Sequence, residues 1–101
     1  MIVKLDLNNP EFQKEWFGLE KEDFLATKNT LQKLCSMTWN QVYQDRGLRW
    51  EKIRSLKTGK GRELYTIRLS KKHRAVVYRK NEFIIFVSLH PDHDSAYRHT
   101  P

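Results

Sequence analysis

The sequence predicts a small α+β domain, in which an N-terminal strand and two to three helices precede an antiparallel meander of three or four strands. Residues 2–7 alternate apolar and polar side chains with a period of two, residues 9–47 carry apolar side chains at helical spacing, and the period of two returns from residue 48. We therefore expect the helices on one face of the sheet and an open, basic second face. A chain of 101 residues can bury one modest core, so a single domain over residues 1–101 is expected.

The N-terminal half begins with a strand and continues with helices. Asn9 followed by Pro10 predicts a helix start, because Asn caps free N–H groups and Pro fits the first helical position. Thr38 with Gln41 three residues on matches a capping box, and Gly47 matches the end of this third helix. The apolar positions of the strand and first two helices are Val3, Leu5, Leu7, Phe12, Trp16, Leu19, Phe24, Leu31, Leu34 and Cys35. We expect these residues, Cys35 included, to face the core.

The C-terminal half predicts strands joined by short connections. The strand segments are "LRWEKIRSL", "ELYTIRLS", "HRAVVYRK" and "EFIIFVSLH", and the hairpin-sized connections "SKK" and "KNE" separate the last three. Arg74, Val76 and Tyr78 are expected to share one face, opposite Ala75 and Val77. "EFIIFVSLH" is apolar on both faces, which is typical of a central or helix-covered strand.

Positive charge is concentrated in the middle third of the chain. Residues 46–80 carry thirteen lysines and arginines against two acidic residues, a net charge of +11, whereas residues 1–45 and 81–101 each carry −2. Such a concentration repels itself in the folded state, so it favours a polyanionic partner such as nucleic acid. A solvated face of long side chains is the alternative interpretation.

Composition disfavours several other classes of protein. No apolar run approaches the ~20 residues of a membrane helix, so no membrane partner is expected. The start "MIVKLDLNN" lacks the basic and apolar segments of a secretory signal. With one cysteine, Cys35, an internal disulfide framework is excluded. A cytoplasmic protein is therefore the expectation.

Three motifs in residues 50–98 together resemble a known family. They are the strand "LYTIRLS" with tyrosine and arginine three apart, the strand "HRAVVY", and a His-x-x-x-Tyr ending after an apolar strand. Their order and spacing are similar to those of the RelE/ParE superfamily of toxins from bacterial type II toxin–antitoxin systems. The resemblance implies a RelE-like fold and, in the favoured branch, a ribosome-dependent mRNA endonuclease (an mRNA interferase) that inhibits translation. A ParE-like, non-enzymatic inhibitor of DNA gyrase and an inactive nucleic-acid-binding homologue are the alternatives.

The resemblance also implies site residues. Arg74 matches the arginine that contacts the scissile phosphate in the mRNA-cleaving branch, and His93 and Tyr97 match a histidine and an aromatic residue four apart near the C-terminus. Arg68 matches a basic residue of the preceding strand. The residues expected to bind RNA are Lys57, Lys60, Arg62, Arg68, Lys71 and Lys72.

These residue types suit cleavage of RNA by its own 2′-hydroxyl, which needs no metal. The planar fork of Arg74 can bind two phosphate oxygens and stabilise the charge of the phosphorane. His93 can act as acid or base, because an unperturbed histidine titrates near pH 6.5, close to working pH. Tyr97 can position the substrate. Lysines around the site would change ground-state binding and its salt dependence.

The stretch "LHPDHDSAYRH", residues 89–99, holds three histidines and two aspartates. These types can ligate zinc, but the ligands would all come from one short stretch and no CxxC or HExxH partner motif is present, so neither a metal nor another cofactor is expected. His90 is expected to have no role, since Pro91 enforces a turn after it. Asp92 and Asp94 would either orient an imidazole or cap a turn. His73, in a tight hairpin, is expected to be exposed.

The partners are those that the resemblance implies. They are a cognate antitoxin that covers the basic face, the ribosome with its mRNA, and operator DNA bound only through the antitoxin. Whether the free toxin forms a homodimer is left open by the sequence.

Overall fold

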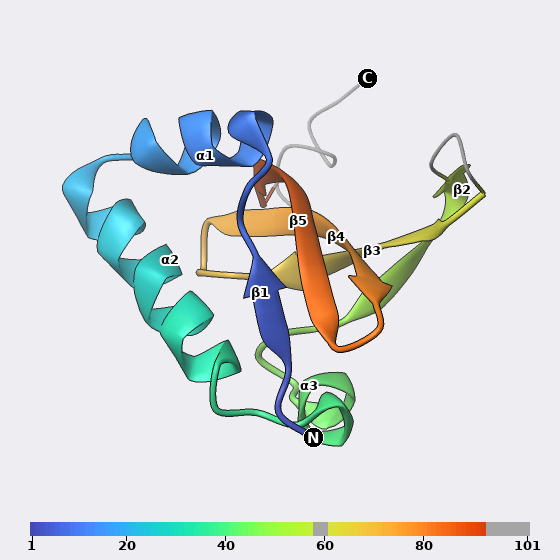
Figure 1. Ribbon diagram of the computed structural model, residues 1–101. Coiled ribbons are helices and arrows are strands. Elements are labelled where there is room, and N and C mark those ends of the chain that lie inside the picture. The colour runs from blue at the N-terminus through green and yellow to red at the C-terminus, as the bar shows by residue number, and fades with distance from the viewer. Residues whose placement is uncertain (58–60, 93–101) are drawn as a thin grey trace.

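The computed structural model describes residues 1–57 and 61–92, with side chains for residues 1–54 and 61–92. Figure 1 shows the elements in chain order. They are β1 (Lys4–Asp6), α1 (Pro10–Phe17), α2 (Lys21–Leu34), α3 (Trp39–Gln44), β2 (Glu51–Lys57), β3 (Glu63–Arg68), β4 (His73–Lys80) and β5 (Phe83–Pro91). The fold is α+β, which confirms the predicted class and element order.

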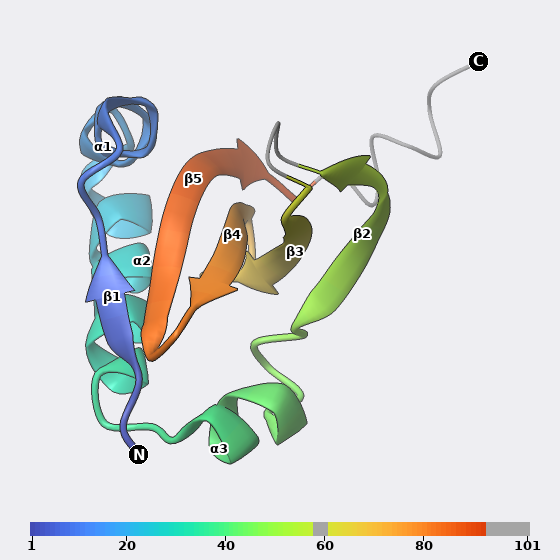
Figure 2. The ribbon, with the colours of Figure 1, turned by 45° about the vertical axis from the view of Figure 1, so that its right-hand side comes forward.

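The five strands form one mixed sheet in the order β1-β5-β4-β3-β2. Strands β2 to β5 are the predicted antiparallel meander, whereas β1 pairs in parallel with β5, Leu5 opposite Ile84. The helices between β1 and β2 make this possible, because they carry the chain away from β1 and leave its edge free for the last strand. Figures 1 and 2 show α1 and α2 beside β1 and β5, with α3 at the opposite end of the sheet from α1.

Local capping determines where the helices begin and end. The Asn9 side chain accepts a hydrogen bond from the Glu11 N–H at 2.8 Å, and Thr38 and Gln41 form the reciprocal bonds of the predicted capping box. The third helix ends at Gln44, before the predicted Gly47, because Asp45 turns the chain by accepting the Leu48 N–H at 2.9 Å. No helix among the described residues is long and apolar enough to cross a membrane.

The core lies between the helices and one face of the sheet. The centroid of the Phe12 ring of α1 lies 5.1 Å from that of Phe86 on β5, and Ala75 and Val77 of β4 are fully buried. The prediction for Cys35 is wrong: it is exposed. It follows Leu34, the last inward-facing residue of α2, and caps that helix.

A β-bulge in β5 changes which residues face the helices. Val76 of β4 lies opposite Ser88, but its neighbour Val77 lies opposite Phe86, so β5 has one additional residue, Val87, at this point. The alternation therefore shifts, and Leu89 is buried like Phe86 although the two are three positions apart. As a consequence, the last residues of β5 present a different set of side chains to the open face than strict alternation would.

Candidate functional site

The face of the sheet that points away from the helices carries cross-strand rows of side chains. At one end of the sheet Arg68 of β3 lies opposite Arg74 of β4, and Arg74 lies opposite His90 of β5. Directly opposed residues have Cβ atoms about 5 Å apart, so these three side chains are immediate neighbours. We call Arg68, Arg74 and His90 the cationic row, after its two arginines.

Two further rows follow along the strands. The middle row consists of Glu51, Thr66, Val76 and Ser88. The apolar row, one step further, consists of Ile53, Leu64, Tyr78 and Ile85. All four side chains of the apolar row are partly exposed. The open face is therefore divided by chemical type, and the predicted phase of Arg74, Val76 and Tyr78 is confirmed.

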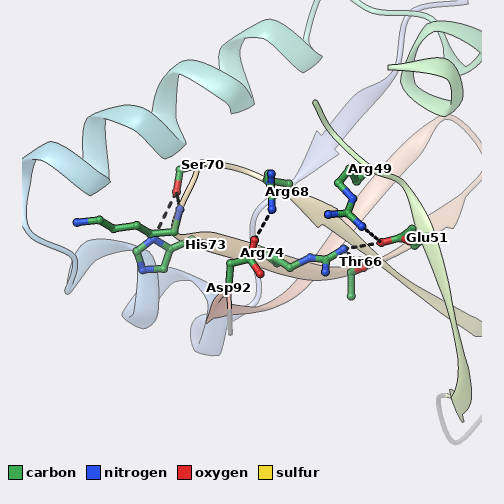
Figure 3. Close-up of polar contacts among 9 residues, drawn as sticks. Arg49, Glu51, Thr66, Arg68, Ser70, His73, Arg74 and Asp92 are labelled. Carbon is green, nitrogen blue, oxygen red and sulfur yellow. Dashed lines mark hydrogen bonds and ion pairs between the residues drawn. The ribbon is translucent and has the colours of Figure 1, made fainter. Parts of the chain in front are cut away.

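Arg74 is held over the middle row by two acceptors. Its Nη2 donates to Glu51 Oε1 at 2.8 Å and to Thr66 Oγ1 at 3.0 Å (Figure 3). Arg49 lies 3.7 Å from the same Glu51 oxygen, so one carboxylate contacts two guanidinium groups. The Arg74 side chain is 20% exposed, and its Nε is buried without a hydrogen-bond partner among the described residues. The guanidinium thus has a fixed orientation and a solvent-facing edge.

Arg68 pairs with Asp92, which directly follows β5. Arg68 Nη2 donates to Asp92 Oδ2 at 2.6 Å; the Asp92 side chain is 5% exposed and that of Arg68 is 31% exposed. The Asp92 N–H donates to the Lys72 carbonyl oxygen, which ties the same residue to the β3–β4 turn. The structure therefore gives Asp92 a guanidinium partner, a contact that sequence reasoning did not foresee (Figure 3).

The two described histidines of β4 and β5 occupy opposite faces. His90 is exposed, and its Nε2 lies 2.7 Å from Ser88 Oγ. The prediction of a turn between His90 and Pro91 is wrong, because β5 continues through Pro91, which pairs with His73. His73 is buried, not exposed as expected, because it shares the inward phase of Ala75 and Val77; its Nδ1 lies 3.4 Å from Ser70 Oγ (Figure 3).

Only some of the other predicted site residues lie on the open face. The Arg62 guanidinium lies over the Tyr78 ring, 5.2 Å from its centroid, and so belongs to the open face. Lys71 and Lys72 are exposed in the β3–β4 turn, and Lys72 Nζ lies 4.0 Å from Asp23 of α2, on the helical side. Lys57 ends β2, but its side chain is outside the described part. Lys60, His93, Asp94 and Tyr97 lie outside the described residues.

Sequence reasoning missed two residues of this face, Glu51 and His90, and it considered Asp92 only as a partner of an imidazole or as a cap. Glu51 is one of two acidic residues in the strongly basic segment 46–80, and that isolation was the available signal. His90 lies in the cationic row only because the bulge shifts the alternation of β5. No local sequence pattern predicts that bulge. Within residues 1–57 and 61–92, no group of three or more His, Cys, Asp or Glu side chains is arranged to hold a metal ion.

Comparisons with models of protein families, with curated proteins and with solved structures found no match for this chain. Membership of the RelE/ParE superfamily therefore stays a prediction from the motifs of residues 50–98. The chemistry of the open face is the independent ground on which a function can be proposed.

Proposed function

We propose that this protein is the toxin of a type II toxin–antitoxin system and cleaves mRNA on the ribosome by metal-independent attack of the 2′-hydroxyl. The observation that supports the proposal is the cationic row, in which Arg68, Arg74 and His90 lie side by side on three neighbouring strands and face solvent. Guanidinium groups bind phosphate through paired hydrogen bonds and stay charged at every physiological pH. A phosphodiester is the ligand that best matches this row.

Arg74 stabilises the negative charge of the phosphorane. Among the described residues, both hydrogen bonds that Arg74 donates to protein use Nη2. Its Nη1 is therefore available to a phosphate oxygen. Because Glu51 and Thr66 already hold the guanidinium, little reorganisation is needed when the transition state forms. The 2′ oxygen bonds to phosphorus as the bond from phosphorus to the 5′ oxygen breaks, and His93 either takes the 2′-hydroxyl proton as a base or gives a proton to the leaving 5′ oxygen as an acid. Tyr97 positions the substrate; both roles come from the family resemblance alone.

The other basic residues act on ground-state binding. Arg68 and Arg62 lie on the open face, and each neutralised phosphate contact adds to the salt dependence of RNA affinity. The resemblance assigns RNA binding to Lys57, Lys60, Lys71 and Lys72 as well. The protein acts in the cytoplasm, and an antitoxin with an acidic or amphipathic segment covers the basic face until the toxin is released. The antitoxin also carries the complex to operator DNA.

One observation favours a second candidate, the non-enzymatic gyrase inhibitor. Both arginines of the cationic row already have carboxylate partners, Glu51 for Arg74 and Asp92 for Arg68. A surface that only docks on another protein tolerates such internal pairing, whereas a phosphate must compete with it.

Induction of the protein in a bacterial host, followed by primer extension on one transcript, tests the proposal. We expect cuts at ribosomal A-sites with the wild type, and about 100-fold less cutting with Arg74→Ala, the loss typical of removing one transition-state donor. Lys28→Ala is the matched control, because it removes one positive charge from the exposed side of α2. It should cut like the wild type.

Two results would contradict the proposal. Intact mRNA together with gyrase–DNA cleavage complexes would transfer the assignment to the gyrase inhibitor. Cutting by Arg74→Ala at the wild-type rate would remove the arginine from the mechanism, and with it the cationic row as the reaction site.

A further inference from the structure

We propose that the apolar row of the open face, with Tyr78 at its centre, is a platform that stacks an unpaired base of single-stranded RNA. This inference rests on the proposed function, since it assigns a base-binding subsite to the same interface. Tyr78 is partly exposed and lies opposite Ile85 on β5, and the continuing register places Leu64 of β3 on its other side. The ring is thus flanked on the open face by apolar side chains from both neighbouring strands.

The Arg62 guanidinium gives the platform a second stacking surface. It lies over the Tyr78 ring with its central carbon 5.2 Å from the ring centroid. Both an aromatic ring and a guanidinium plane can stack on a nucleobase, and such stacking tolerates every base because each has a π-face. The pair can therefore receive a base on the guanidinium or beside it on the ring.

The platform is at a suitable distance from the phosphate site. Tyr78 lies four residues from Arg74 on the same face of β4, which corresponds to about 13 Å along the strand. The Arg74 guanidinium bonds Glu51 and Thr66 of the middle row, so the side chain extends about half of that distance towards Tyr78. A phosphate bound by Arg74 and a base stacked at Tyr78 would thus belong to neighbouring nucleotides.

Charge complementarity favours RNA over a protein occupant. Arg68 and Arg74 lie on one side of the apolar row, beyond the middle row, and the exposed Lys80, which follows Tyr78 on the same face of β4, lies on the other side, while Arg62 lies over Tyr78 itself. An apolar strip between two cationic margins matches a strand with anionic phosphates on both sides of a flat base. The base must be unpaired, because in a duplex its faces are already stacked and its edges are paired.

Fluorescence anisotropy with a short labelled RNA tests the platform. The RNA carries 2′-O-methyl riboses, which prevent cleavage by 2′-hydroxyl attack. We expect Tyr78→Leu, which keeps an apolar side chain but removes the ring, to bind about tenfold more weakly with an unchanged salt slope. Tyr78→Phe keeps the ring and should bind within twofold of the wild type. Arg74→Ala should instead lower both affinity and the salt slope, by about one unit of slope for one lost phosphate contact.

A second measurement needs no change to the protein. An abasic oligonucleotide of the same length and charge should bind the wild type about tenfold more weakly than the RNA with bases, and Tyr78→Leu should discriminate less between the two. The comparison of abasic and intact RNA on the wild type tests base stacking even if Tyr78→Leu fails to fold. A circular dichroism melt shows whether that variant is folded.

Three outcomes would overturn the platform: equal affinity of the wild type for abasic and intact RNA, unchanged affinity of folded Tyr78→Leu, or no measurable binding of the RNA by the wild type. Each would leave the apolar row to a protein partner. None of them depends on cleavage in the host, so a failed platform with A-site cuts would leave the nuclease assignment intact. If binding depends on the bases but no cuts appear, the nuclease assignment is wrong and the base-stacking platform is retained.

Discussion

Arg68 and Asp92 form an ion pair that joins two strands that are not neighbours in the sheet. Arg68 ends β3 and Asp92 follows β5, so the 2.6 Å contact passes over the first residues of β4. The carboxylate is almost fully buried and the guanidinium is one-third exposed. The pair therefore fixes the end of β5 next to the cationic row.

Replacement of Asp92 by alanine should destabilise the protein. The substitution leaves a partly buried guanidinium without its charged acceptor, and a hydrogen bond to a charged group contributes about 2 kcal/mol to the free energy of unfolding. Urea denaturation of wild type and Asp92→Ala measures this loss. Asp23→Ala is the control, because the Lys72–Asp23 contact is 4.0 Å long with a mostly exposed lysine and should contribute under about 0.5 kcal/mol. Equal losses in both variants would show that Asp92 does not anchor the end of β5.

Removal of the Glu51 carboxylate should separate RNA binding from catalysis. Glu51 contacts Arg74 and Arg49, and its negative charge competes with a phosphate for both. We expect Glu51→Ala to bind RNA about two- to fivefold more tightly, the range of an exposed ion pair. Cutting should nevertheless decrease, because the Arg74 guanidinium loses the acceptor that orients it.

Anisotropy and primer extension on the same Glu51 variants measure the two effects. Glu51→Gln keeps an acceptor oxygen without the charge, so it should bind like Glu51→Ala and retain more cutting. Weaker RNA binding by Glu51→Ala would contradict the competition between carboxylate and phosphate.

Asp45 should make the stability of the protein depend on pH in the acid range. The hydrogen bond from Lys33, at 3.0 Å, holds the pKa of this carboxyl below its ordinary value of 3.8, with help from the Leu48 and Gly47 N–H groups and against the effect of burial. A lowered pKa means that the folded state prefers the ionised form. The resulting stabilisation is present above the ordinary pKa and is lost as the pH falls through the lowered one.

Urea denaturation at pH 7 and near pH 2 measures this contribution. We expect Asp45→Asn to cost up to about 1 kcal/mol at pH 7, the value of a largely surface ion pair, and less near pH 2, because the stabilisation is lost as the pH falls through the lowered pKa. Lys4→Ala, which removes a 3.7 Å contact between exposed side chains, is the control and should show no such difference. The same loss at both pH values would mean that Asp45 acts through its geometry alone.

Local signals in the sequence predicted the elements well. The Thr38–Gln41 capping box and the Asn9–Pro10 start depend on residues within one turn, and the structure contains both. The parallel pairing of β1 with β5 was not predicted, because it joins residues about eighty positions apart and has no local signature. Cys35 was misplaced because the helical stripe was extended by one residue past Leu34.

The candidate site was predicted only in part for the same reason. The face of Arg74 follows from alternation within β4, and alternation in β3 likewise indicates the face of Arg68. Glu51 and His90 reach the open face through the register of β2 and β5, and in β5 that register depends on the bulge at Val87. Pairing between strands is decided by packing over the whole sheet, which a single sequence does not display.

Single substitutions of His90 and His93 should separate the roles of these two histidines. The resemblance makes His93 the acid or base. We therefore expect His93→Gln to reduce cutting about 100-fold, the usual contribution of a positioned proton-transfer group. His90 lies in the cationic row beside Arg74, with Ser88 Oγ 2.7 Å from its Nε2, so His90→Gln should chiefly weaken RNA binding and leave cutting at saturating RNA within a few-fold. Single-turnover cleavage with purified ribosomes, at varied toxin concentration, distinguishes the two effects. The reverse pattern, with a 100-fold loss for His90→Gln and little change for His93→Gln, would assign proton transfer to the histidine opposite Arg74, because that imidazole would then be the one that meets the reacting phosphate.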